Sequence, residues 1–368
     1  MFDIKYIELA KIIEDKIEDG EWPEQLPGYM VLAKTFNVHH LTVSKAIKLL
    51  AAKGKLTIRG TKGTFVTKKK PNERQTYNAL AIIGLLNDTI SMQETAEIEK
   101  YAKGYDIIPI LIRKHGEAAS TRLLEMPVDG VIFTNLTLDV DTIAALRQNG
   151  MPFISTNRFS AIEGVNWVDY DNENGLKESL EYLLSLDHKK IAYLAFANFW
   201  PEHEERMKTI YQNTMEKADC FDQSLYFASS EFKQYFDRYG DDCWEEYGKT
   251  TIKKLLNLPN PPTAIFVHNI KMANGVYSFL KKEKIPVPRN LSIIAGALTS
   301  RELTNEKFYT LLAAPTSECI FKATQILLKI IHEPSSPITQ ILLPRKLIVQ
   351  NSTAPVITSK VNSKILNF

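Results

Sequence analysis

Positively charged side chains that could bind nucleic-acid phosphates are concentrated in one segment of the chain. Residues 34–70 contain ten Lys or Arg residues and no Asp or Glu. Residues 1–77 carry 14 basic and 9 acidic side chains, a net charge of +5, whereas the other 291 residues carry 31 and 34, a net charge of −3. A small basic module on a nearly neutral body is the charge pattern of a DNA-binding domain joined to a larger domain with another function.

The side chains that could read DNA bases lie on a helix predicted over residues 39–53. Its apolar residues recur at helical spacing and must face a core: Val43, Ala46, Ile47 and Leu50. The polar residues left on the first turns and the outer face are His39, His40, Thr42, Ser44, Lys45 and Lys48. Such a helix fits the major groove, which is about 12 Å wide. The two adjacent histidines have no Cys, Asp or Glu at ligand spacing, so we expect no metal site there.

A short hairpin that could hold the DNA backbone follows this helix. Two short β segments are predicted within residues 56–66, on either side of a Gly-x-x-Gly turn. Glycines let the backbone of the tip approach a phosphate closely. The residues expected to contact DNA here are Arg59, Lys62, Gly63 and Thr64. Two further helices, over residues 3–18 and 29–36, are predicted to complete the core under the reading helix.

Three ordered motifs of this segment resemble a GntR-type winged helix-turn-helix. They are Leu26-Pro27, Thr42-Val43-x-x-Ala46-Ile47 and Gly60-x-Lys62-Gly63-Thr64-Phe65-Val66. The resemblance implies a domain that binds double-stranded operator DNA. The chain departs from the family at two places. Gly28-Tyr29-Met30 stand where Ser-Glu-Arg is usual, and His39-His40 replace a Ser-Arg pair.

The remainder of the chain has the alternating strand and helix pattern of an α/β domain. From residue 80 onwards, short apolar runs predicted as buried strands alternate with amphipathic helices, which indicates parallel sheets built from right-handed crossovers. We therefore expect a winged helix-turn-helix domain at residues 1–68 and a polar linker at 69–78. A large α/β domain is expected at 79–353, followed by a C-terminal tail at 354–368.

Several motifs of the large domain resemble the LacI/GalR effector domain, which has the two-lobed fold of periplasmic sugar-binding proteins. They include Asp129-Gly130-Val131-Ile132, Leu186-Asp187-His188-Lys189-Lys190-Ile191 and Leu343-Pro344-Arg345. The resemblance implies three crossings of the chain between the lobes. It places lobe one at residues 79–156 and 288–314, and lobe two at 157–287 and 315–353. It also implies a homodimer formed through this domain. The combination of the two domains resembles sugar-catabolism regulators of the arabinose-repressor type.

Polar and aromatic residues that follow predicted strands are the candidates for a sugar site. Sugars are bound through hydrogen bonds to their hydroxyl groups and through a stacked aromatic ring. The candidates are Asn87, Asp88, Asn157, Arg158, Trp200, Arg206, His268 and Asn269. The resemblance implies that Arg206 contacts the effector. It also places Ile270 where the family has an effector-binding Asp, and a 6-deoxyhexose such as fucose or rhamnose could pack its methyl group there.

Alternatives remain for several of these residues. Arg158 could be a salt-bridged hinge residue, and Trp200 could anchor a loop. His188 is expected to be structural. The segment 229–248, which is rich in aromatic residues, could form a lid or a dimer contact.

Several classes of protein find no support in the sequence. Residues 1–20 are charged throughout, without the apolar segment of a secretory signal. No apolar run approaches the ~20 residues that span a bilayer. The three cysteines are odd in number and far apart, so we expect no disulfide and a cytoplasmic protein. Nucleotide-binding and hydrolase motifs are absent, so we expect neither an enzyme nor a cofactor or metal.

The sequence therefore predicts a ligand-controlled transcription regulator. The leading hypothesis is a repressor of a carbohydrate-utilisation operon that is released by a monosaccharide, a pentose or deoxyhexose such as arabinose, fucose or rhamnose. The alternative is a constitutive dimeric DNA-binding protein whose sensor domain has no ligand or binds a non-sugar such as a nucleobase. Ile270 favours this alternative.

Overall fold

The chain folds into two compact units, each built from two separate stretches of sequence. Unit 1 comprises Met1–Asp169 and Cys319–Ile341, and unit 2 comprises Tyr170–Glu318 and Leu342–Phe368. The computed structural model describes residues 4–67, 76–85, 89–112, 123–124, 126–134, 140–156, 158, 163–196, 201–229, 232–298 and 307–356. Within unit 1, residues 4–67 are called the head, and the rest is called the unit-1 body.

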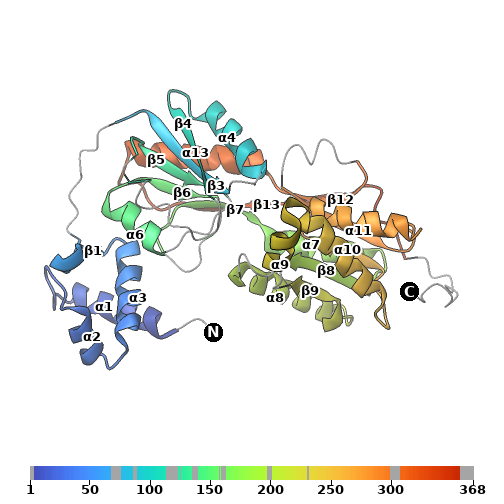
Figure 1. Ribbon diagram of the computed structural model, residues 1–368, viewed down its shortest axis with the longest axis horizontal. Helices are drawn as coiled ribbons and strands as arrows, with labels where there is room; N and C mark the ends of the chain where they lie inside the picture. Colours follow the sequence, from blue (N-terminus) through green and yellow to red (C-terminus); the bar gives the residue numbers. More distant parts are fainter. Residues whose placement is uncertain are drawn as a thin grey trace. The chain divides into compact units, whose positions relative to one another are not determined.

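The head contains three helices and a small β-hairpin (Figure 1). Its elements are α1 Ile4–Glu18, α2 Tyr29–Thr35, α3 His40–Ala52, β1 Leu56–Ile58, the 3-10 turn η1 Gly60–Lys62 and β2 Thr64–Val66. β1 and β2 pair in antiparallel fashion, with Ile58 opposite Thr64. The turn before α3 contains Asn37 at φ 50°, a left-handed conformation that Asn tolerates. The predicted winged helix-turn-helix is confirmed.

The unit-1 body is built on a six-stranded sheet with the strand order β13-β7-β6-β5-β3-β4. The strands are β3 Ala79–Leu85, β4 Asp106–Ile112, β5 Gly130–Phe133, β6 Phe153–Ser155, β7 Trp167–Asp171 and β13 Gln340–Pro344. β3 to β7 form parallel pairs with their neighbours. The helices are α4 Thr89–Tyr101, α6 Val140–Gln148 and α13 Thr316–His332. Leu327 of α13 packs over Gly130, where an added Cβ would lie 3.0 Å from its side chain.

Unit 2 is built on a second six-stranded sheet with the order β14-β12-β11-β10-β8-β9. The strands are β8 Ile191–Phe196, β9 Tyr226–Ser229, β10 Ala264–Val267, β11 Ser292–Ala297, β12 Thr310–Ala313 and β14 Lys346–Ile348. The helices are α7 Asn172–Ser185, α8 Pro201–Lys217, α9 Phe232–Tyr239, α10 Cys243–Leu256 and α11 Ile270–Lys282. Strands β8 to β12 are parallel to their neighbours, and β14 is antiparallel to β12.

Alternation along β8 shows why the unit-2 sheet is covered on both faces. Tyr193 belongs to the apolar cluster that includes residues of α7 and α8. Its neighbour Leu194 belongs to the cluster that includes residues of α10 and α11. Successive side chains of a strand point to opposite faces, so the strands of a sheet buried on both faces read as continuous apolar runs. The predicted α/β class with parallel sheets is confirmed.

The first division between the lobes lies later in the chain than predicted. The sequence predicts that lobe two begins at residue 157. In the structure, β7 still belongs to the first sheet, with Trp167 opposite Ser155 of β6. The chain therefore passes to unit 2 at Asp169–Tyr170.

The segment 288–314, which the sequence places in lobe one, belongs to unit 2 instead. β11 follows β10 through α11 and pairs with it in parallel, with Ala264 opposite Ser292. Backbone hydrogen bonds of β11 with β10 and with β12 therefore hold this segment in unit 2. Conversely, Cys319–Ile341, predicted in lobe two, belongs to unit 1. The chain still passes between the units three times.

The chain after β14 is hydrogen-bonded to the rest of unit 2 beyond residue 354, where the sequence predicts that the C-terminal tail begins. The backbone N of Val356 donates to the carbonyl of Leu186 at 3.0 Å. The carbonyl of Ala354 pairs with Nε2 of His188 at 2.9 Å, and Nδ1 of the same ring pairs with Oγ1 of Thr263 at 2.9 Å. His188 is buried and joins separate segments of unit 2, which agrees with a structural role.

Candidate nucleic-acid interface and effector site

The predicted recognition helix, α3, begins with two exposed imidazoles. His39 has the extended backbone of an N-cap, and its Nδ1 accepts a hydrogen bond from the backbone N of Leu41 at 3.3 Å. The ring centroids of His39 and His40 lie 4.2 Å apart. Both rings therefore stand at the end of the helix from which helix-turn-helix proteins contact base edges.

The outer face of α3 is fixed by the burial of the opposite face. The residues of the predicted core stripe are fully buried: Val43, Ala46, Ile47 and Leu50. Lys45 is exposed, and its Nζ lies 5.8 Å from the centroid of the Tyr6 ring, a cation–π distance. Thr42 and Ser44 are half-buried. The structure thus brings the predicted base-reading residues of α3 together on the outward part of one helix.

Sequence reasoning missed exposed apolar side chains on the helix-turn-helix. Leu41 is 58% exposed in the first turn of α3. Met30 and Val31, in the first turn of α2, are 72% and 56% exposed. The sequence does carry a signal for Leu41, because this residue falls outside the stripe that defines the core face.

The tip of the hairpin presents two cations. Arg59 and Lys62 are exposed, and the guanidinium carbon of Arg59 lies 5.0 Å from the centroid of the Phe65 ring. Nε2 of Gln25 donates to the carbonyl of Lys62 at 3.1 Å and so fixes the tip against the preceding loop. Gly63 has φ 107°, in the region that favours glycine. Thr64 is only 4% exposed, so its side chain belongs to the core of the hairpin and not to the surface that could reach DNA.

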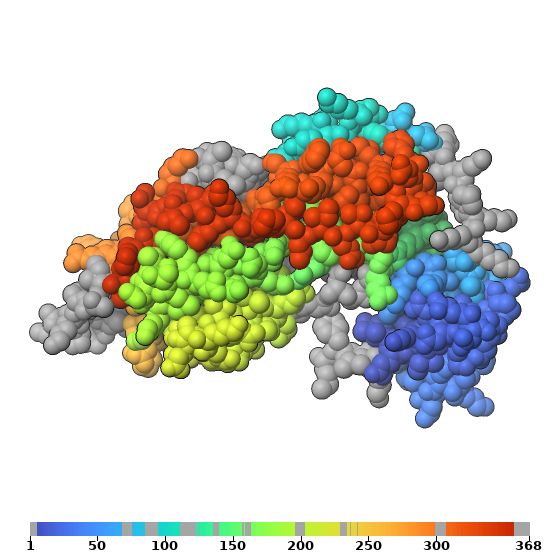
Figure 2. Space-filling model, turned by 180° about the vertical axis from the view of Figure 1, so that it is seen from behind, coloured from blue at the N-terminus to red at the C-terminus, as the bar shows by residue number. Residues whose placement is uncertain are grey.

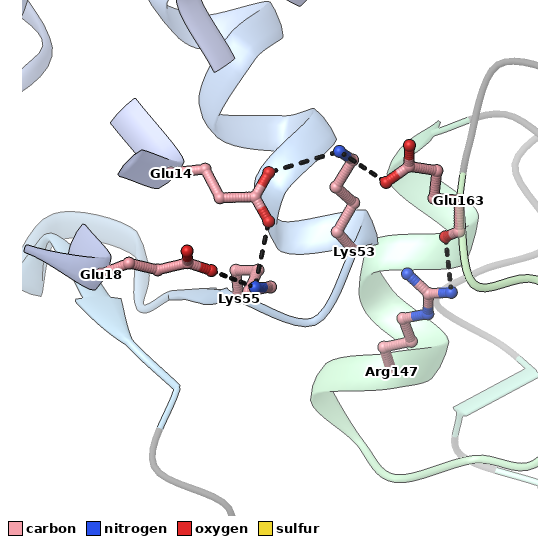
Figure 3. Close-up of polar contacts among 6 residues, drawn as sticks. All are labelled: Glu14, Glu18, Lys53, Lys55, Arg147 and Glu163. Carbon is pink, nitrogen blue, oxygen red and sulfur yellow. Dashed lines mark hydrogen bonds and ion pairs between the residues drawn. The ribbon is translucent and has the colours of Figure 1, made fainter. Parts of the chain in front are cut away.

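Other cations of the head are already paired with carboxylates (Figure 3). Lys53 Nζ lies 3.4 Å from Glu14 and 3.1 Å from Glu163 of the unit-1 body. Lys55 Nζ lies 3.0 Å from the second oxygen of Glu14 and 2.9 Å from Glu18. Burial would raise the pKa of Glu14, but the hydrogen bond from Lys55 and the charges of both lysines outweigh it and lower that pKa.

The head also contacts the unit-1 body through α3 and α6, which pack against each other. Lys48, expected on the outer face of α3, pairs with Asp141 of α6 at 2.8 Å. Arg147 of α6 donates to the carbonyls of Glu163, at 3.3 Å, and Gly164. Burial lowers the pKa of Arg147 to about 10. Lys48, Lys53 and Lys55 therefore contribute less free positive charge than their number in the sequence suggests.

The predicted effector residues are only partly covered by the structure. Asn87, Asp88, Asn157 and Trp200 lie outside the described residues. Arg158 is in unit 1, where its backbone N donates to the Asp169 carboxylate at 2.9 Å. The other three, Arg206, His268 and Asn269, are in unit 2.

Two of the predicted effector residues of unit 2 have roles in the fold. Nε of Arg206, on α8, donates to the Glu173 carboxylate of α7 at 2.6 Å. Oδ1 of Asn269 accepts from the backbone N of Met272 at 2.8 Å and so caps α11. Ile270 is buried in the apolar cluster that includes residues of α10 and α11. The structure therefore accounts for Arg206 by an ion pair, for Asn269 by helix capping and for Ile270 by packing.

A polar group at the carboxyl ends of β10 to β12 is centred on Arg345, which belongs to a motif named above but is not among the predicted effector residues. Its Nη1 donates to Oδ1 of Asn172 at 2.8 Å, and its Nη2 donates to the carbonyls of Ala297, at 3.2 Å, and Leu312, at 2.6 Å. Burial, together with the positive charge of Arg345, lowers the pKa of His268 to about 4. Ligands of parallel α/β sheets bind at this edge, so the Arg345–His268 region is the part of unit 2 best placed for an effector.

A second cluster of unit 2 holds a buried carboxyl group. The Tyr226 hydroxyl donates to the carboxylate of Glu204, and burial raises the pKa of Glu204 to about 7. The ring of Tyr193 stacks on those of Tyr226 and Phe266, with centroid distances of 5.0 and 5.8 Å. These side chains lie beneath α8 and link it to the sheet.

A groove of about 310 Å³ on the surface of unit 2 lies between α7 and α8. These helices are adjacent and are coloured green and yellow-green in Figure 2. The groove is lined by Lys177, Glu181, Leu184, Ile210, Asn213, Thr214, Lys217 and Ala218. None of the predicted site residues is among them. In the described part of the chain, no helix is suited by length and apolarity to cross a bilayer.

Comparison with known proteins finds a matching family model in two segments of the chain. Residues 5–66 match the bacterial regulatory proteins of the gntR family, and residues 180–353 match the periplasmic binding protein-like domain. The HTH-type transcriptional repressor CytR of Escherichia coli strain K12 is 27% identical over 172 residues, 47% of this chain and 47% of that protein. In this alignment the chain spans about half the length of the curated relative it matches.

One relative aligns along nearly the whole chain. The arabinose metabolism transcriptional repressor of Geobacillus stearothermophilus is 22% identical over 380 residues, 96% of this chain and 98% of that protein. Among solved structures, a LacI family transcriptional regulator of Enterococcus faecium with bound ribose has a TM-score of 0.64 at 20% identity. The structural alignment covers 76% of this chain and 100% of the chain in that structure. The chain therefore has an N-terminal helix-turn-helix segment that matches the gntR family, followed by a larger domain with the periplasmic-binding-protein fold.

Proposed function

We propose that this protein is a DNA-binding transcriptional repressor of sugar utilisation, acting in the cytoplasm as a homodimer and released from its operator by a monosaccharide. The observation that carries the proposal is the exposed face of the head. On it, the imidazoles of His39 and His40 begin α3, and the cations of Arg59 and Lys62 stand at the hairpin tip. A recognition helix in the major groove and a cationic wing on the phosphates need such a surface.

The comparisons support the sugar part of the proposal. The relative that aligns along nearly the whole chain is named for arabinose metabolism, and a neighbouring structure holds ribose. We propose that a pentose or a deoxyhexose binds at the carboxyl ends of the unit-2 strands, near His268 and Arg345. The predicted residues Asn87, Asp88, Asn157, Arg158, Trp200, Arg206 and Asn269 remain candidates for the same ligand.

Selection from random-sequence DNA duplexes tests the DNA-binding function and does not require a known operator. The full-length protein should enrich duplexes with two related half-sites in inverted orientation, because a symmetric dimer reads a palindrome. Adding the effector sugar to the complex should release the DNA. The absence of any enriched sequence at low salt would rule out a sequence-specific regulator.

A second candidate is a constitutive DNA-binding protein whose sensor binds no sugar. Ile270 favours it, because its burial in an apolar cluster leaves no carboxylate at this position to bind sugar hydroxyls. A thermal-shift panel of pentoses, deoxyhexoses and nucleobases separates the two candidates. A ligand at 100 times its dissociation constant adds about 2.7 kcal/mol to the free energy of unfolding. If no sugar in the panel raises the melting temperature, the second candidate is favoured.

A further inference from the structure

Leu41 stands on the outward face of the reading helix. Residues four and seven positions apart share a face of a helix, so Leu41 lies in line with Lys45 and Lys48. Val43, two positions away, points to the opposite side and is fully buried. Leu41 therefore projects from the side of α3 that carries the cations, and 58% of its surface is exposed.

The surface around Leu41 is suited to DNA and not to an apolar partner. Residues 34–70 contain no Asp or Glu, and Lys45 and the two imidazoles are its exposed neighbours on α3. Further along the same face, Lys48 pairs with Asp141 of α6. An anionic duplex complements this charge. A large aliphatic group set among cations has a specific counterpart in the major groove, the C5-methyl group of thymine.

The helix-turn-helix also lacks several of the side chains that make direct base contacts. The sequences of α2 and α3, YMVLAKT and HLTVSKAIKLLAA, contain no Arg, Asn, Gln, Asp or Glu. Arg is the commonest reader of guanine, and Asn or Gln reads adenine through two hydrogen bonds. Lys45, Thr42 and the two imidazoles can still hydrogen-bond to bases, and apolar contact by Leu41 is a further source of sequence information on this face.

We propose that Leu41 reads thymine methyl groups, so that the preferred half-site has thymine at the positions facing the first turn of α3. This inference rests on the proposed DNA-binding function and specifies the bases that it recognises. Met30 and Val31, exposed in the first turn of α2, extend the apolar surface of the helix-turn-helix. A first helix crosses the DNA backbone in this fold, so Leu41 carries the base contact.

Replacing thymidine by deoxyuridine tests the proposal, because it removes the methyl group and leaves the base-pairing edge unchanged. The probes are duplexes recovered by the random selection, resynthesised with deoxyuridine at one thymidine position at a time. Full-length wild-type protein should bind the duplex about fourfold more weakly for each methyl group that Leu41 covers. The Leu41→Ser variant should bind the thymidine and deoxyuridine duplexes equally.

Ile12→Ser is the matched control. Ile12 is an apolar residue of α1 with 46% exposure, and its loss should leave the discrimination between thymidine and deoxyuridine unchanged. Circular dichroism and thermal unfolding confirm that each variant is folded. Recovered sites without thymine, or equal binding of both duplexes by the wild type, would overturn the inference and leave the proposed function intact. A methyl preference that survives in Leu41→Ser would also overturn it. If no duplex is enriched, the proposed function itself fails.

Discussion

The polar groups of the head and those at the edge of the unit-2 sheet are used in different ways. On the head, His40, Lys45 and Lys62 are exposed. In unit 2, Arg345 is buried, and its guanidinium hydrogen-bonds to groups from three other segments. We therefore expect the proposed DNA-binding surface to tolerate substitution without loss of the fold, whereas the proposed effector site shares its groups with the fold.

Removing Arg345 should produce the largest loss of stability. It tests whether the proposed effector site shares its groups with the fold. In Arg345→Met, the buried carbonyls of Ala297 and Leu312 lose a charged donor, so the free energy of unfolding should fall by about 3 kcal/mol. Urea unfolding followed by tryptophan fluorescence measures this change. Lys45→Ala is the control and should stay within about 0.5 kcal/mol of wild type. A fully stable Arg345→Met protein would break the contrast.

The buried Glu204 should make the stability of unit 2 depend on pH. Its pKa is raised to about 7, so the folded state retains a proton that the unfolded state releases above the ordinary value of 4.5. Its contribution is therefore fully present below pH 4.5 and is lost as the pH rises to about 7, by at most about 3 kcal/mol. His268, with its lowered pKa of about 4, acts in the opposite direction, and its contribution is lost as the pH falls from 6.5 towards 4.

Comparing wild type with Glu204→Gln isolates this carboxyl group. Urea unfolding at pH 5, 6, 7 and 8 should show a wild-type advantage at low pH that declines as the pH rises, since His268 is common to both proteins. The stability of the head should not follow this pattern. A constant difference between the two proteins across this range would contradict the burial of Glu204 as the cause.

Removing the cations of the hairpin tip should affect DNA binding and leave stability unchanged. In Arg59→Ala combined with Lys62→Ala, the slope of log affinity against log salt should become shallower by about 0.9 for each phosphate that is no longer neutralised. Fluorescence anisotropy with a random-sequence duplex measures the slope. Lys253→Ala, an exposed lysine of α10, is the matched control and should leave it unchanged. An unchanged slope in the double variant would show that the hairpin does not reach the DNA.

The smallest expected effect is on the salt dependence of DNA binding when the carboxylate that pairs with Lys48 is removed. Asp141→Asn removes the carboxylate that pairs with Lys48 at 2.8 Å and should make the salt slope steeper by up to about 0.9. Glu163→Gln is the control, because Lys53 keeps its second partner Glu14. Equal slopes in wild type and Asp141→Asn would show that Lys48 does not reach a phosphate.

The fold of the head could be predicted because its elements depend on local patterns. The apolar stripe Val43-x-x-Ala46-Ile47-x-x-Leu50 fits the spacing of a helix. Gly63 adopts a positive φ, a conformation that favours glycine. The same periodicity locates the outer face of α3. It could not show that Thr64 is buried or that Lys48 meets Asp141, because both depend on contacts between distant segments.

The division into units could be predicted only in outline. Apolar runs identify strands, but they do not say which sheet a strand joins, so the lobe predicted for residues 288–314 is wrong. Strand ends indicate His268 as a residue at the edge of the sheet. The role of Arg345 depends on three backbone and side-chain acceptors that come together only in the folded chain.

Lys53 has a consequence for how the head is attached. Its ammonium group is shared between Glu14, inside the head, and Glu163, whose side chain is 85% exposed. If the head separates from α6, water solvates Glu163 and Lys53 remains neutralised by Glu14. Separation therefore leaves Lys53 paired, and the Lys53–Glu163 pair that breaks has one strongly exposed partner, so it contributes about 1 kcal/mol at most. The pairing of Lys53 with Glu14 inside the head therefore does not depend on the contact with the unit-1 body.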